Sequence, residues 1–165
     1  GKEKEMMPNF KALIERIAKN EGYRQDVYKC TAGYDTVGIG FALKDLDISQ
    51  ELSHDIIKWQ IEKGLIRISL EHSKNKTGEL LSSLHLRWLD KLAWYKDLPP
   101  MVQTILIEMS FQMGISGVSK FRKMLKAMQE KDWKESANQM LDSKWAKSDS
   151  PGRANRLADI VRDHG

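Results

Sequence analysis

The sequence predicts an α+β fold, with a small antiparallel sheet near the N-terminus and helices over most of the remaining chain. Two observations predict this class. Apolar residues recur at helical spacing along most of the 165 residues. Between Val27 and Phe41, however, the period changes to two, and the segment is rich in β-forming residues and glycines. A chain of this length suits one compact domain, and its single cysteine excludes an intrachain disulfide framework.

The first helix is expected at residues 8–20. Apolar residues there follow the i, i+3, i+4, i+7 pattern of an amphipathic helix, at Phe10, Leu13, Ile14 and Ile17. Pro8 suits the first turn of this helix and Gly22 suits its end. Glu21 is therefore expected in the last helical turn, directly before the sheet.

The sheet is expected to have two or three strands, within an N-terminal lobe of about residues 22–52. Alternate residues of a strand share a face, so Thr36, Gly38 and Gly40 are expected on one face of this sheet. That face carries one hydroxyl group and two positions of bare backbone. Glycines in strands more often mark turns and bulges than ligand sites, so this face alone establishes no function.

A long connecting helix is expected at about residues 53–72, where apolar residues keep helical spacing. At about 1.5 Å per residue, such a helix is roughly 30 Å long and can link two lobes. The polar stretch 73–78 is expected to form a loop. Beyond it, helices form a larger lobe at about residues 80–162, on which the helix at 8–20 packs, and Gly114 is expected to stop one of these helices.

Residues 10–165 are accordingly assigned to one two-lobed domain, and residues 1–9 are interpreted as a cloning remnant or a truncated N-terminus. The chain starts with Gly1 rather than methionine, and no apolar leader follows. No apolar run approaches the roughly 20 residues that a membrane span requires. The four histidines lack metal-ligand spacing, and no phosphate-binding glycine loop occurs, so no metal or other cofactor is expected.

The formal net charge is +4, which suits an anionic partner such as a bacterial wall, nucleic acid or an acidic membrane surface. Charge alone does not choose between these partners. Because Lys and Arg are interleaved with Asp and Glu, the same charge also fits a merely soluble surface. Packing roles are expected for the five tryptophans, at Trp59, Trp88, Trp94, Trp133 and Trp145.

Glu21 is the main candidate for chemistry. A carboxylate at the negative end of a helix, and partly buried, is disfavoured as an anion, so Glu21 is expected to hold its proton near neutrality. Glycoside hydrolysis requires such an acid, together with a second group that activates or bears the nucleophile. Thr36 is suited to hold a water molecule by its hydroxyl group while a sugar lies flat over Gly38 and Gly40. Each residue alone is ordinary for a helix end or a strand, and their joint spacing favours the functional interpretation.

The order of residues in this segment is specific: Glu21-Gly22, Tyr28-Lys29, Gly33-Tyr34 and Thr36-Val37-Gly38-Ile39-Gly40. Further on stand Phe111-Gln112-Met113-Gly114, Gly117-Val118, Phe121, Trp133, Trp145, Pro151, Arg153-Ala154 and Arg156. Over about residues 10–162, this pattern resembles the T-even phage lysozymes, a family of cell-wall muramidases also called endolysins.

The resemblance implies a lysozyme-like fold and an inverting hydrolysis of the β-1,4 bond between N-acetylmuramic acid and N-acetylglucosamine. It implies that Glu21 is the general acid, that Thr36 and Cys30 handle the hydrolytic water, and that Arg153 pairs with Glu21. It further implies substrate contacts for Gly38, Gly40, Ala42, Phe111, Gln112 and Gln139.

Three residues depart from the family pattern. Cys30 stands where most members have an aspartate, and a thiol is a weak hydrogen-bonding group whose thiolate alone is a good base or nucleophile. We expect Cys30 to be a tolerated variant of the catalytic set, and its use as a papain-like nucleophile finds no histidine partner in the motif. Phe41 replaces a frequent histidine, and Ala42 replaces a larger apolar residue, which leaves details of sugar contact open.

Peptidoglycan is therefore the expected partner of a monomeric enzyme that is made in the host cytoplasm and acts on the periplasmic wall. The main alternative is a catalytically impaired homologue that binds the wall without cleaving it. A helical nucleic-acid binder rests only on charge and tryptophans, without a helix-turn-helix or RNA-binding signature. A free endolysin, a tail-associated lysozyme and a toxin module all remain open, as does the export route.

Overall fold

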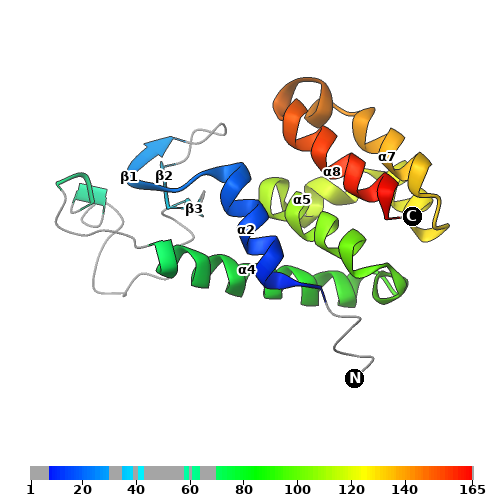
Figure 1. Cartoon of the computed structure of the whole chain (residues 1–165), viewed down its shortest axis with the longest axis horizontal. Coiled ribbons are helices and arrows are strands. Elements are labelled where there is room, and N and C mark those ends of the chain that lie inside the picture. The colour runs from blue at the N-terminus through cyan, green and yellow to red at the C-terminus, as the bar shows by residue number, and fades with distance from the viewer. Residues whose placement is uncertain are drawn as a thin grey trace. The chain divides into compact units, whose positions relative to one another are not determined.

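A computed structural model of the chain describes residues 8–29, 35–38, 41–42, 58–59, 61–63 and 70–164 (Figure 1). The chain divides into two compact units, which are described separately here. The sheet unit comprises Ile14–Glu79, and the helical unit comprises Gly1–Leu13 together with Leu80–Gly165.

Helix α2 runs over Phe10–Glu21, close to the expected range. Its start is set by Asn9, whose side-chain Oδ1 accepts a hydrogen bond from the Ala12 backbone N–H at 3.0 Å and so caps the first turn. Leu13 and Ile17 are buried, as the amphipathic pattern predicts. The helix ends at Glu21, and Gly22 follows with a φ of 74°.

A three-stranded antiparallel sheet follows, in the order β1 (Arg24–Lys29), β2 (Asp35–Gly38), β3 (Phe41–Ala42). In the register of β1 and β2, Lys29 pairs with Asp35 and Tyr28 with Thr36, and the register is irregular between Tyr28 and Arg24. The sequence did not predict this irregularity, because no glycine or proline marks it within β1.

The α+β class expected from the sequence is wrong, because the described chain is mainly helical. Where side chains as well as backbone are described, 83% of the chain is helical and no strand occurs. The strands are only six, four and two residues long. The change of period between Val27 and Phe41 coincides with the described strands, but strands this short do not set the class of a mainly helical chain.

Helix α4 covers Leu70–Lys91 and corrects two further expectations. The stretch 73–78 is helical rather than a loop, and the helix near 72 continues instead of ending there. Ser73 and Thr77 are buried, and the Thr77 hydroxyl donates to the Ser73 carbonyl at 2.8 Å. Small polar residues thus occupy part of the buried face of this helix, so the spacing of apolar residues does not reveal the helix there.

Gly78 explains why α2 and α4 approach closely within the sheet unit. A Cβ atom at position 78 would lie 3.3 Å from the Ile14 Cδ1 atom, which is tighter than most carbon contacts. An ion pair between Lys74 Nζ and Glu15 Oε1 at 2.7 Å joins the same two helices. Short helical segments are also described at residues 58–59 and 61–62, and Trp59 is 53% exposed there, so its expected packing role is wrong.

The helical unit begins with the end of α4 and a 3-10 turn, η2 (Tyr95–Asp97). The other elements are α5 (Pro100–Ser119), α6 (Arg122–Gln129), α7 (Trp133–Leu141), the π-helical turn η3 (Trp145–Asp149) and α8 (Pro151–Asp163). Helix α7 packs against α6 and α8, and α8 also packs against α5 and η3. Gly114 breaks α5 with φ 78° and ψ 159°, which confirms the helix break predicted there.

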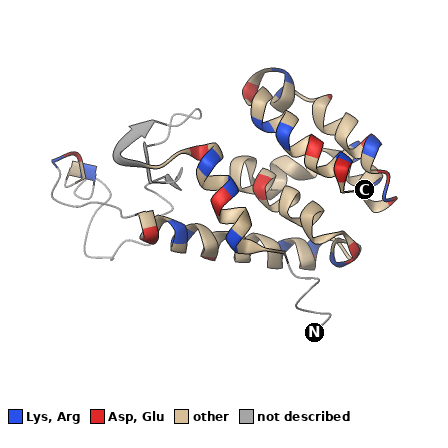
Figure 2. Ribbon diagram, in the orientation of Figure 1, with Lys and Arg blue, Asp and Glu red and all other residues tan. Residues whose placement is uncertain are grey.

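The core of the helical unit centres on α5, in which every residue from 102 to 110 is buried. Trp88 and Trp145 are buried as expected, and Trp88 Nε1 donates to Ser110 Oγ at 2.8 Å. Basic and acidic residues are both spread over the described helices, without a long run of either sign (Figure 2). Among these helices, none combines the length and the apolar character needed to cross a membrane.

Candidate active site

Glu21 lies at the point where the chain changes from helix to strand. Its side chain is half-buried. Gly22, with its positive φ of 74°, donates its N–H to the Ala18 carbonyl at 2.8 Å, and the chain enters β1 at Arg24. A residue with a side chain is strained in this left-handed conformation, so glycine allows the abrupt turn. The predicted position of Glu21 is confirmed, and its role as an acid stays a prediction.

Three of the other predicted site residues lie in described strands. Thr36 in β2 pairs with Ala42 in β3 and with Tyr28 in β1, so the sheet places the backbones of Thr36 and Ala42 side by side. Gly38 ends β2, opposite Arg24. Cys30 and Gly40 lie outside the described residues.

In the helical unit, Phe111 and Gln112 lie on α5 just before the break at Gly114, and both are half-buried. Gln112 Nε2 donates to Ser150 Oγ at 2.7 Å, and Gln112 Oε1 accepts from Trp145 Nε1 at 3.0 Å. Since the indole N–H is only a donor, it fixes which amide atom faces which partner. The Gln112 amide is thus held in one orientation by residues 33 and 38 positions away.

The indole of Trp145 is itself held in place. Its ring meets Phe121 edge-on, with ring centroids 6.1 Å apart and an interplanar angle of 82°. The sequence predicted Trp145 as a packing residue, which its burial confirms. The hydrogen bond to Gln112 adds an orienting role that helical spacing does not reveal.

Arg153 on α8 is almost fully buried, with 8% of its side chain exposed. Its Nε donates to Oε2 of Glu108 on α5 at 2.9 Å, and Glu108 is fully buried. The sequence analysis missed Glu108. The sequence feature that could have revealed Glu108 is that it is the one charged residue of a mainly apolar helix, because a buried charge requires a partner.

Gln139 on α7 is half-buried, and its Nε2 donates to Glu135 Oε1 at 2.6 Å on the same helix. The predicted residues therefore belong to two groups. Glu21, Thr36, Gly38 and Ala42 belong to the sheet unit, and Phe111, Gln112, Gln139 and Arg153 belong to the helical unit. The pairing of Arg153 with Glu21 joins residues of different units and stays a prediction. Among the described residues, no three His, Cys, Asp or Glu side chains gather as metal ligands do.

Comparison with known proteins assigns the chain to a family. Residues 18–162 match the model of the phage lysozymes, and this span contains every candidate site residue. The chain belongs to the phage lysozyme family. The resemblance noted from the sequence is therefore confirmed.

Similar proteins include two from Dictyostelium discoideum. Probable T4-type lysozyme 1 is 27% identical over 91% of this chain and 93% of its own length. Probable T4-type lysozyme 2 is 31% identical over 90% of this chain and 92% of its own length. The pre-baseplate central spike protein Gp5 of Enterobacteria phage T4 is 29% identical over 93% of this chain, which matches 28% of that protein. The chain is thus a lysozyme-like glycoside hydrolase, and the family implies peptidoglycan as its substrate.

Proposed function

We propose that the chain is a muramidase that cleaves the β-1,4 bond between N-acetylmuramic acid and N-acetylglucosamine with inversion, and that it acts in bacterial cell-wall lysis. The observation that carries this proposal is the position of Glu21 at the end of α2, directly before the sheet, in a chain of the phage lysozyme family. We further propose that the enzyme is a monomer made in the host cytoplasm that acts on the periplasmic wall.

In the proposed reaction, Glu21 donates its proton to the glycosidic oxygen as the bond from the anomeric carbon to that oxygen breaks. A water molecule held by Thr36 and Cys30 attacks the anomeric carbon from the opposite face and gives its proton to solvent water, from which Glu21 is protonated again. An inverting mechanism requires room for this water between the two catalytic groups. The backbone of Thr36, paired between β1 and β3, gives the water-binding side a fixed position.

Arg153 is proposed to orient Glu21. Glu108 supports this role, because its Oε2 accepts a hydrogen bond from Arg153 Nε at 2.9 Å. This bond fixes the plane of the guanidinium group. Glu108 also places a negative charge beside that of Arg153.

Gln112 is proposed to bind the sugar chain together with Phe111 and Gln139, and the same role is proposed for Gly38, Gly40 and Ala42. The support for Gln112 is its fixed amide, which Ser150 and Trp145 hold from two sides. A side chain that is held before the substrate binds loses little conformational freedom on binding.

Digestion of purified murein tests the proposal. Mass spectrometry of the products should show glycan fragments that end in reducing N-acetylmuramic acid. The alternative, a homologue that binds the wall without cleaving it, predicts sedimentation with intact sacculi and no new reducing ends. Fragments that end in reducing N-acetylglucosamine would contradict the assigned bond, and release of peptides alone would contradict glycoside hydrolysis.

A further inference from the structure

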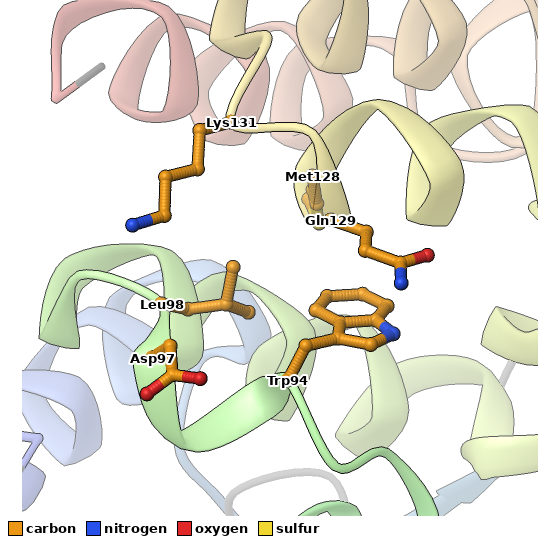
Figure 3. Close-up of a pocket in the computed structure, with 6 residues that line it drawn as sticks. All are labelled: Trp94, Asp97, Leu98, Met128, Gln129 and Lys131. Carbon is orange, nitrogen blue, oxygen red and sulfur yellow. The ribbon is translucent and has the colours of Figure 1, made fainter.

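A cavity of about 320 Å³ lies within the helical unit, between the turn that follows α4 and the C-terminal end of α6 (Figure 3). It is lined by Trp94, Asp97, Leu98, Met128, Gln129 and Lys131, and is called the Trp94 pocket below. None of these six residues is assigned to the cleavage reaction. Figure 3 shows Asp97 and Lys131 toward one end of the pocket, Trp94 and Gln129 toward the other, and Leu98 and Met128 between them.

The wall formed by residues 94–98 is fixed by hydrogen bonds. The Asp97 N–H donates to the Trp94 carbonyl at 3.1 Å and closes the 3-10 turn. Tyr95 within this turn is fully buried, and its hydroxyl shares a hydrogen bond of 2.8 Å with His85 Nδ1. The Tyr95 carbonyl accepts from Gln103 Nε2 at 3.0 Å. The turn therefore holds Trp94 and Asp97 at set positions around a buried anchor.

The opposite wall ends in a strained residue. The Asp132 N–H donates to the Ala127 carbonyl at 2.8 Å and the Lys131 N–H donates to the Met128 carbonyl at 3.0 Å, which is the Schellman pattern of a helix end. This pattern favours glycine at the left-handed position, yet Lys131 occupies it with a φ of 58°. Among the described residues, it is the one non-glycine residue with a positive φ. Strain of this kind is often found where a side chain serves a ligand site.

The side chains of the pocket suit a neutral sugar. Leu98 and Met128 are buried and supply an apolar side chain from each wall, and Trp94, half-buried, offers an aromatic surface for the C–H groups of a sugar ring. Asp97, Gln129 and Lys131 are exposed and supply a carboxylate, an amide and an ammonium group for hydroxyl and acetamido groups. The charges of Asp97 and Lys131 offset each other, which disfavours a strongly charged ligand.

We infer that the Trp94 pocket binds an N-acetylated sugar unit of a glycan strand, at a site additional to the cleavage site. Its volume of about 320 Å³ lies at the lower end of the range for small-molecule sites, roughly 300–1,000 Å³, so it suits a short piece of glycan. The choice of an N-acetylated sugar rests on the proposed function, since that sugar type would then be the substrate's own. Such a site would retain the enzyme on its polymer between cleavage events.

The test uses tri-N-acetylchitotriose as the probe and the indole N–H resonance of Trp94 in an isotope-labelled protein as the readout. The resonance is assigned from its absence in Trp94→Phe. Titration should shift this resonance in a saturable manner, and Trp94→Ala should weaken the binding measured at the neighbouring amides by at least about tenfold. Because the readout is local, binding of the probe elsewhere does not mimic this result.

Lys131→Gly distinguishes a loss of binding from a loss of stability, because the two quantities should change in opposite directions. Glycine relieves the strain at the end of α6, so the midpoint of thermal unfolding should rise by roughly 2 to 4 °C. The same change removes a hydrogen-bonding group from the pocket and should weaken the probe about three- to tenfold. The matched control is Lys96→Ala, which removes an exposed lysine from η2 that does not line the pocket and should leave affinity unchanged.

Two results would overturn the inference. One is a Trp94 resonance that does not respond to the probe at millimolar concentration. The other is an affinity that is equal in the parent protein and in Lys131→Gly. Neither result depends on hydrolysis. If the protein digests murein but the Trp94 resonance does not shift, only the inferred pocket is refuted. If the Trp94 resonance shifts but murein stays intact, only the proposed cleavage is refuted.

Discussion

The ion pair between Glu108 and Arg153 makes a quantitative prediction. Glu108 is fully buried and Arg153 is 8% exposed, so water screens the pair little. Replacing Glu108 by methionine removes the carboxylate bound at Nε of a buried cation. This change should lower the free energy of unfolding by about 3 to 5 kcal/mol. At about 2 to 4 °C per kcal/mol, the unfolding midpoint should fall by roughly 6 to 20 °C.

The double variant, with methionine at both positions, should recover most of this loss, because neither charge then remains buried. Urea unfolding of the parent, both single variants and the double variant measures the coupling between the two residues. The control is the exposed pair Lys147–Asp142, which has a 2.7 Å contact but side chains that are 67% and 68% exposed. Its removal should leave the free energy of unfolding almost unchanged, because solvent screens exposed charges. A cost below about 1 kcal/mol for Glu108→Met, or additive costs in the double variant, would refute the reasoning.

Three further predictions concern stability at low pH, the fixed glutamine and the thiol. Burial lowers the pKa of His85 from its usual 6.5, so the folded state resists a proton that the unfolded chain binds. Stability should therefore hold above about pH 6.5 and decrease as the pH falls below it, and urea midpoints of His85→Gln should decrease less than those of the parent; equal slopes would contradict this. Trp145→Phe removes the N–H that orients Gln112 and should raise KM about three- to tenfold with a smaller effect on kcat, whereas an unchanged KM would show that the orientation is unimportant. If Cys30 holds the attacking water, Cys30→Ala should slow hydrolysis, Cys30→Asp should retain or raise it, and alkylation of the thiol should inhibit; three unchanged rates would make Cys30 a bystander.

Local patterns predicted the parts of the fold that depend on neighbouring residues. The end of α2 at Glu21 follows from helical spacing and from Gly22, and the break in α5 follows from Gly114. Both glycines have a positive φ, a conformation in which other residues are strained. The ends of these helical segments could therefore be predicted without any knowledge of tertiary contacts.

Other features of the fold could not be predicted from the sequence, because they depend on tertiary packing. Ser73 and Thr77 form part of a buried helix face although their side chains are polar, so the polar stretch was mistaken for a loop. The α+β class was wrong because the described chain is mainly helical, and the share of each element in a fold depends on the whole chain rather than on one segment. Trp59 was assigned to packing from helical spacing, which does not reveal which face of a helix is covered.

The candidate site shows the same division. Glu21 and Thr36 were found from their spacing, and their positions on α2 and β2 agree with it. The partners of Gln112 lie 33 and 38 residues away, and Glu108 lies 45 residues from Arg153. Contacts at such separations arise only from the folded arrangement. Glu108 was detectable as a lone acid in an apolar helix, although its partner was not.

The most direct test of the account is the rate at which Glu21→Gln releases reducing ends from purified murein. Glutamine has almost the shape of glutamate but cannot donate the required proton, so the rate should fall by about 100-fold or more while the fold is retained. Glu15→Gln is the matched control, since it changes another acid on α2 that is exposed and pairs with Lys74, and it should keep the parental rate. Equal rates for Glu21→Gln and the parent protein would contradict the central claim.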